Sequence, residues 1–250
     1  MSFDIGKLAE KTESLSIDPI YNTNWCDMPD DIKLECIGKM EFRERLSLRC
    51  TAKAERSLVD LQKIKFSRGS FFSDIYSDHY NVYLASKNGD TLDKEFKNAH
   101  RALKPMKTTW KIGVFENFFI ASNEKAVKKE MKSYNGKISA KNINLHNCDN
   151  EMAVAVLQKM NPGVESITMD NYDNIRSYPV DKILKISVVQ NASYWQIKRY
   201  HQMDILHKVT QMWIDNNSKI GFTFQVFYFE NPPPDSSFEE FSDRFANRIV

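Results

Sequence analysis

The chain has 250 residues, of which 42% are hydrophobic and 12% aromatic, and it carries a net charge of +2. This apolar content is sufficient for a packed core and excludes a disordered protein. The nearly balanced charge gives no global field of the kind that indicates a nucleic-acid-binding protein.

Residues 1–24 are polar and charged, without the apolar run that a secretory signal requires. The longest apolar stretch, residues 220–229, is too short to span a membrane and predicts a buried strand. The cysteines show no paired spacing, which is typical of reduced thiols. We therefore expect a flexible N-terminal segment on a soluble, intracellular protein, either cytoplasmic or nuclear.

A helix is predicted to begin near Pro29. Proline suits the first helical turn because it has no N–H to leave unpaired, and Asp30 and Asp31 then place negative charge where the helix dipole favours it. Apolar residues recur at helical spacing, so Lys33 is expected to face solvent. The predicted apolar stripe consists of Ile32, Cys36, Ile37 and Met40.

Two more short helices are predicted before residue 61, and a unit of this size buries little apolar surface by itself. The Met28–Pro29 start, the first helix and the continuation LSLRCTAKAERSLVD resemble an F-box. This resemblance implies that residues 25–61 bind a Skp-type linker subunit, and through it a cullin. Lys33 and Glu55 depart from the family pattern and put the strength of linker binding in doubt. The implied linker-binding residues are Trp25, Met28, Pro29, Ile32, Ile37 and Met40.

Residues 62–230 are predicted to form an α/β domain. Alternating apolar residues predict strands at 64–66, 81–84 and 110–115, with a helix at 93–103. Four further alternating segments, at 143–145, 167–169, 186–188 and 212–214, are each followed by an asparagine. A helix at 150–160 ends before Asn161-Pro162-Gly163. A repeat of strand, asparagine and helix every roughly 20–25 residues is typical of a leucine-rich-repeat-like layer. One mixed sheet with helices on one face is the alternative.

Four motifs in this region carry a second resemblance: WKIGVFENFF, KISAKNINLHNCD, AVLQKMNPGVESI and DILHKVTQMWIDNNSKIGFTFQV. Together with the upstream F-box they resemble the proteins that combine an F-box with an FTH domain, a family expanded in nematodes. The predicted fold class is α+β, with a three-helix F-box followed by an α/β leucine-rich-repeat-like domain. The implied function is substrate recognition in an SCF-type (cullin–RING) ubiquitin ligase, with no cofactor and no metal.

Nothing in the sequence indicates an enzyme. With 8 glycines spread thinly, the chain has no phosphate-binding loop. His146 and Cys148 are two residues apart and would share one face of a strand, but no second pair follows to complete a metal site. We therefore expect no catalytic residue.

A basic segment, residues 94–132, contains Trp110, Phe115, Phe118 and Phe119, and such a pattern can bind single-stranded RNA by stacking. These aromatic residues alternate as in a buried strand, so direct nucleic-acid binding is not expected. The alternative function is a protein-interaction scaffold that acts with an RNA-binding protein, independently of ubiquitylation.

Target proteins are expected to bind where the predicted strands end, because binding residues collect on loops that a rigid scaffold positions. The polar side chains at these ends suit an adaptable interface. The candidate target-binding residues are His146, Asn147, Asp170, Tyr172 and Tyr194. The acidic tail, residues 231–250, is expected to be peripheral.

Overall fold

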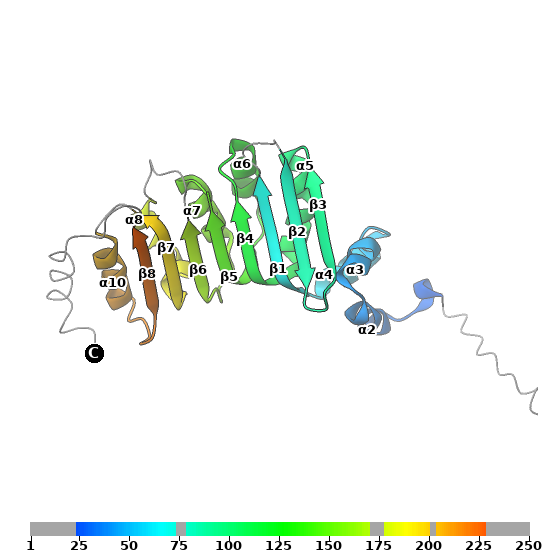
Figure 1. Ribbon diagram of the computed structural model, residues 1–250. Helices are drawn as coiled ribbons and strands as arrows, with labels where there is room; N and C mark the ends of the chain where they lie inside the picture. Colours follow the sequence, from blue (N-terminus) through cyan, green and yellow to red (C-terminus); the bar gives the residue numbers. More distant parts are fainter. Residues whose placement is uncertain (1–23, 74–78, 171–177, 201–203, 229–250) are drawn as a thin grey trace, which may run out of the picture. The chain divides into compact units, whose positions relative to one another are not determined.

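The computed structural model describes residues 24–73, 79–170, 178–200 and 204–228 (Figure 1). The chain divides into two compact units, Met1–Lys39 and Met40–Val250, so the predicted boundary after residue 61 does not coincide with the division. The acidic tail, Tyr172 and all but the last residue of the predicted N-terminal segment lie outside the described residues. In the ranges described, no helix has the length and apolar character needed to cross a membrane.

The first unit contains the short 3-10 helix η1 (Trp25–Asp27) and the helix α2 (Asp30–Lys39). The Asn24 side chain accepts a hydrogen bond from the Cys26 amide at 3.3 Å and so caps η1. The Pro29 carbonyl accepts from the Lys33 amide at 3.0 Å, as the first bond of α2. The predicted helix start near Pro29 is confirmed.

The predicted apolar stripe of α2 is wrong at two positions. Lys33 is 8% exposed, whereas Ile32 is 43% exposed. Lys33 lies four residues before the fully buried Ile37, so the two share one face of the helix. Ile32 lies five residues before Ile37 and therefore about 140° around the helix axis. Burial of Ile37 thus turns Lys33 inward and Ile32 outward.

The second unit begins with α3 (Phe42–Leu48) and α4 (Lys53–Leu61). A capping box starts α3, in which the Glu44 carboxylate accepts from the Glu41 amide at 2.8 Å. The Arg49 guanidinium donates two hydrogen bonds to Asp60 of α4, at 2.5 and 3.1 Å. This bidentate pair holds the end of α3 against α4.

Among the described residues, one mixed sheet of eight strands follows, in the order β3-β2-β1-β4-β5-β6-β7-β8. The first three strands pair antiparallel, and β1 and all later neighbours pair parallel (Figure 1). The strands are β1 (Ile64–Ser73), β2 (Tyr80–Ser86), β3 (Thr91–Phe96), β4 (Gly113–Ala121), β5 (Ser139–His146), β6 (Ser166–Asp170), β7 (Tyr194–Tyr200) and β8 (Thr223–Tyr228).

Helices lie between the parallel strands along the chain, as parallel pairing requires. They are α5 (Ala99–Ile112), α6 (Lys125–Ser133), α7 (Asn150–Lys159), α8 (Val180–Ile183), α9 (Ser187–Asn191) and α10 (Ile205–Asp215). The fold class is therefore α+β, with N-terminal helices followed by a mixed sheet and helices. This is the arrangement expected as the alternative to a leucine-rich-repeat-like layer.

The strand registers show that the two faces of the sheet differ in composition. On one face, Phe118 of β4 is followed across the sheet by Ile143, Ile167 and Trp195, all buried. The Trp110 ring of α5 packs edge-on against the Phe118 ring at 6.3 Å, so the helices cover this face. We call it the covered face.

Residues of the opposite parity along the same strands form the open face. Its central row runs from Phe119 through Asn144, Thr168 and Gln196 to Gln225. Each of these side chains is at least partly exposed. The row two residues earlier along the strands contains Asn117, Asn142, Ser166, Tyr194 and Thr223. The row two residues later contains Ala121, His146, Asp170, Lys198 and Phe227.

A glycine in β1 allows close packing on the covered face. A Cβ atom at Gly69 would lie 2.4 Å from the Phe115 ring. Its absence lets Phe115 stack on Phe66, with ring centroids 5.2 Å apart. Phe66 in turn contacts Phe42 of α3 at 5.2 Å, which continues the core into the helices before the sheet.

Several predicted elements are confirmed and others are wrong. The predicted strands at 64–66, 81–84, 143–145 and 167–169 lie in β1, β2, β5 and β6, and the predicted helix at 150–160 is α7. The predicted strand at 186–188 is instead the N-cap and the first two residues of helix α9, and the one at 212–214 lies in helix α10. Over a longer window Ile205, Val209 and Met212 recur at helical spacing and are buried.

The region from residue 91 to residue 115 also differs from its prediction. The predicted helix at 93–103 begins instead at Ala99, after β3, because the Asn98 side chain caps it by accepting from the Arg101 amide at 3.2 Å. That helix, α5, continues to Ile112, so the predicted strand at 110–115 begins only at Gly113.

The last strand was predicted to be buried, and this is wrong. β8 lies at the edge of the sheet, and its residue Phe227 is 51% exposed. Ile220, which precedes the strand, is 94% exposed. An edge strand has one neighbour, so its side chains and backbone are less enclosed than those of a central strand.

Candidate partner-binding surfaces

The residues implied in linker binding differ in their accessibility. Pro29 is exposed and Ile32 is 43% exposed, whereas Trp25 and Met28 are partly buried. Ile37 is fully buried, so its side chain supports the helix from inside. Met40 is partly buried and begins the second compact unit. Ile32 is therefore the most accessible apolar side chain of α2.

Three of the candidate target-binding residues lie together at the ends of β5 and β6. The His146 Nδ1 atom is 3.7 Å from Oδ2 of Asp170, and the two residues are register partners. The Asn147 amide donates to the Asp170 carbonyl at 2.7 Å. Asn147 has a φ of 48°, a left-handed conformation that asparagine tolerates better than most residues. Asparagine at this position thus ends β5.

Tyr194 lies on the same face but at the other end of the strands. It pairs with Ser166, whereas Asp170 pairs with Lys198, so Tyr194 is about 13 Å from the level of Asp170 along the strand direction. Its hydroxyl donates to Oε1 of Gln225 at 2.7 Å. The predicted residues therefore belong to one face without forming one cluster.

Side chains of neighbouring strands on the open face bond one another. Gln196 Nε2 donates to Tyr194 and to Gln225, both at 3.0 Å. On the other half of the face, Asn142 Nδ2 donates to Oδ1 of Asn117 at 3.1 Å. These amide ladders fix the orientation of polar side chains before a partner arrives, which reduces the entropy lost on binding.

Aromatic rings lie beside the amides. Phe119 is partly exposed, and its ring lies 5.9 Å from the His146 ring. Phe72, at the end of β1, is 38% exposed. Oriented polar groups next to partly exposed rings are the composition of protein-binding surfaces. The sequence analysis did not identify Phe119, Asn142 or Gln196 as functional; the strand register assigns them to one face.

The pairing of His146 with Cys148 as half of a metal site is excluded by their positions. Cys148 is fully buried, with its sulfur 3.5 Å from the Ile120 carbonyl, whereas His146 lies on the open face. Burial raises the pKa of the Cys148 thiol to about 12, so it is protonated at neutral pH. Within the described ranges, no group of three or more His, Cys, Asp or Glu side chains could hold a metal ion.

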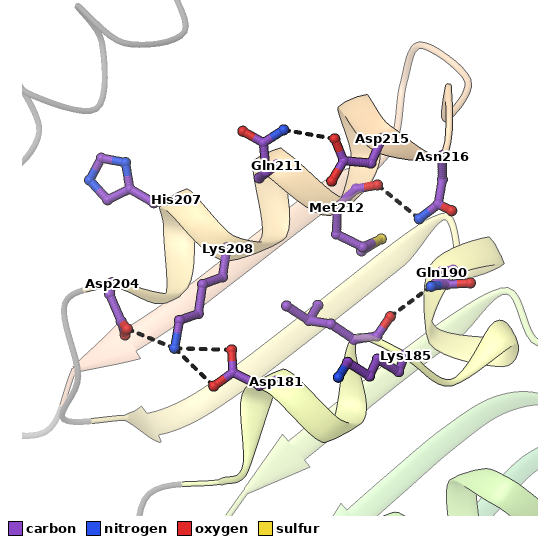
Figure 2. Close-up of a pocket in the computed structure, with 11 residues that line it drawn as sticks. Asp181, Lys185, Gln190, Asp204, His207, Lys208, Gln211, Met212, Asp215 and Asn216 are labelled. Carbon is purple, nitrogen blue, oxygen red and sulfur yellow. Dashed lines mark hydrogen bonds and ion pairs between the residues drawn. The ribbon is translucent and has the colours of Figure 1, made fainter.

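A cleft of about 770 Å³ lies between α10 on one side and α8 and α9 on the other (Figure 2). Lys208 joins its two walls, with Nζ 2.8 Å from Asp204 and 3.1 Å from Asp181. Gln211 donates to Asp215 at 2.8 Å. Because these charged and polar groups bond one another, they indicate no particular ligand.

Comparison with known families adds one decisive observation. Residues 25–67 match the F-box domain. The matched range covers η1, α2, α3, α4 and the start of β1 and is well under half of the chain, so it assigns the N-terminal region alone. No curated protein and no solved structure matches the chain.

The F-box match indicates a general role. F-box domains bind Skp-type linkers and thereby join cullin complexes, and the match therefore indicates an adaptor of an SCF-type ubiquitin ligase. Trp25, Met28, Pro29 and Ile32 lie within the F-box, at its N-terminal end. The two departures from the family pattern, Lys33 and Glu55, are both buried, so neither places its charged group on an exposed surface.

Proposed function

We propose that this chain is the substrate-recognition adaptor of an SCF-type (cullin–RING) ubiquitin ligase. Its F-box would bind the Skp-type linker, and the open face of the sheet would bind the target protein. The F-box match carries the first half of this proposal. The second half is supported by a sheet whose open face presents oriented amides and partly exposed rings.

As an adaptor, the chain would hold a target close to the ubiquitin-transfer machinery and would catalyse no step itself. It would act inside the cell, in the cytoplasm or the nucleus, where this machinery works. The sheet domain would be of the FTH type, an assignment supported by the order of the four motifs between residues 110 and 226. The composition of that domain is consistent with protein binding and suggests no cofactor.

Linker binding can be tested with a variant of the exposed end of α2. The double substitution Pro29→Ala and Ile32→Asp changes two exposed positions and leaves the buried Ile37 in place. We expect this variant to lose copurification with the linker, because central apolar anchors dominate interface energy. The matched control is Lys39→Ala, at an exposed position of the same helix. Unchanged copurification of the double variant would contradict the proposal.

Target binding can be tested by affinity purification with and without a proteasome inhibitor. Targets are those proteins that accumulate on the wild-type chain only when their destruction is prevented. Thr168→Arg inserts a long charged side chain at the centre of the open face, and Ser133→Arg makes the same change on an exposed position of α6. We expect the first variant to lose the targets and keep the linker, and the control to keep both.

Two results would change the assignment. Targets that persist on the Thr168→Arg variant would move recognition away from the open face. Partners that bind equally with and without the inhibitor, and that include RNA-binding proteins, would favour a scaffold that acts independently of ubiquitylation.

A further inference from the structure

A groove of about 990 Å³ lies between α3, α5 and the strands β2 and β3. All of these elements belong to the second compact unit. The groove is on the covered side of the sheet, at the end occupied by β2 and β3, and is therefore separate from the open face. Its volume is at the upper end of the range of about 300–1,000 Å³ for small-molecule pockets.

The floor of the groove is aliphatic. Leu84 of β2 is 1% exposed, and its register partner Leu92 of β3 is partly buried. Leu46 of α3 and Pro105 of α5 complete the apolar lining from the two walls. Because the lining is formed by Leu84, Leu92, Leu46 and Pro105, the floor is suited to apolar side chains of an incoming segment.

The rim of the groove is basic. Arg43, Arg49, Lys94 and Lys104 line it together with a single carboxylate, Asp93. In the part of the chain that the structure describes, neither Lys94 nor Lys104 has a carboxylate partner. Both lysines are exposed, so their ammonium groups remain available to a ligand.

The two arginines are held in place by carboxylates at the border of the groove. Arg43 lies 3.2 Å from Asp90, and its own side chain remains 57% exposed. Arg49 is bound by Asp60 and its side chain is 16% exposed. The cations accessible to a ligand are therefore Arg43, Lys94 and Lys104.

The geometry points to a docking site for an acidic peptide segment that carries bulky aliphatic residues. Its carboxylates would contact Lys94 and Lys104 at the rim, and its aliphatic side chains would pack on Leu92 and Pro105. Charge complementarity identifies this occupant, since the accessible rim is cationic and the floor is aliphatic. The inference goes beyond the proposed function: the groove shares its α3 wall with the F-box match but uses neither η1, α2 nor the open face, and the two lysines that test it lie outside the matched range.

A nucleic acid also carries negative charge, but the groove fits it less well. Single-strand binders stack bases on aromatic rings beside a basic channel. No aromatic residue lines this groove among the described residues. An aliphatic floor under a basic rim is better matched by leucine-like side chains between carboxylates.

The test uses the full chain and a short fluorescent peptide in which glutamates alternate with single leucines. Anisotropy should show saturable binding that weakens as salt is added. Two control peptides, with glutamine for glutamate or serine for leucine, should each bind more weakly. The double substitution Lys94→Glu and Lys104→Glu should weaken binding about tenfold, because each removed attraction is replaced by a repulsion.

The control variant is Lys129→Glu, which makes the charge change of one of these two substitutions at an exposed position of α6. It should bind the peptide as the wild type does, and circular dichroism should show that all variants are folded. The proposal is overturned if the peptide does not bind, or if Lys129→Glu weakens binding as much as the groove variant does. It is also overturned if a single-stranded oligonucleotide displaces the peptide and if the double substitution of Lys94 and Lys104 abolishes binding of that oligonucleotide.

Discussion

Phe118 and Phe119 are neighbours in β4, yet their side chains lie on opposite faces of the sheet in different environments. Phe118 is 1% exposed and packs against Trp110 of α5, whereas Phe119 is partly exposed beside His146. The same strands thus build a covered face that stabilises the fold and an open face whose polar groups bond one another. The difference separates residues that hold the domain together from residues available to a partner.

The largest predicted difference concerns thiol reactivity. Burial raises the pKa of Cys148 to about 12 from an ordinary 9.0, so its thiolate fraction is about a thousandfold lower than that of an unperturbed thiol. Cys50, in contrast, is exposed. Iodoacetamide should modify Cys50 in the native protein and Cys148 only after unfolding, as read by mass spectrometry. Rapid native modification of Cys148 would show that the covered face is not closed.

Truncation of the two neighbouring rings tests the faces directly. Phe118→Ala should lower the free energy of unfolding by about 3–5 kcal/mol, because it leaves a cavity in the core. Phe119→Ala should lower it by about 1 kcal/mol or less, as is usual for substitutions outside the core. Urea denaturation of both variants measures the difference, and equal losses would mean that Phe119 is also part of the core.

A smaller effect on stability is expected from Asp60 of α4, whose carboxylate pairs with Arg49 and with Lys111 of α5. Burial opposes ionisation of Asp60, and hydrogen bonds from Arg49 and Lys111 outweigh it, so the pKa of Asp60 lies below its ordinary value of 3.8. The contribution of Asp60 is therefore fully present above that ordinary value and is lost as the pH falls through the folded-state pKa. Asp60→Asn should cost about 1–2 kcal/mol at neutral pH.

The pH dependence provides the control for this prediction. Wild type and Asp60→Asn should converge in stability in strong acid, below the folded-state pKa of Asp60. A difference that stays constant from neutral to acid pH would assign the loss to packing rather than to charge.

The smallest effect on stability is expected on the open face. Gln196→Ala removes hydrogen bonds to Tyr194 and Gln225, both between partly or fully exposed side chains, and should cost about 0.5–1 kcal/mol. If the amide ladder orients a target, the same substitution should weaken target binding by more than it destabilises the fold. A loss in stability alone would indicate that the ladder is structural.

Local signals in the sequence predicted part of this fold. Alternation identified β5 and β6, and the Asn161-Pro162-Gly163 segment marked the end of α7. The windows at 186–188 and 212–214 were too short to separate a strand from a helix, because three residues fit either period. The apolar spacing of α2 did not show which of its residues would be buried. Because Ile37 is the buried one, Ile32 is exposed.

The open face was harder to predict than the elements that form it. Gln196 bonds Gln225 because β7 and β8 pair in parallel, and the two residues lie far apart in the sequence. Alternation indicates which residues of one strand share a face of the sheet. The pairing register between strands is also needed to show that His146 lies beside Asp170 and that Tyr194 lies at the opposite end. The F-box was recognisable because its pattern is contained in a short continuous segment.

The central claim is that one chain joins a Skp-type linker through its F-box and leaves the open face of the sheet available for a target. The most direct measurement is calorimetric titration of the purified full chain with the purified linker. We predict saturable binding with one linker per chain, lost with Pro29→Ala and Ile32→Asp and unchanged with Thr168→Arg on the open face. Absence of binding by the folded wild-type chain, or loss of binding with Thr168→Arg, would contradict the account.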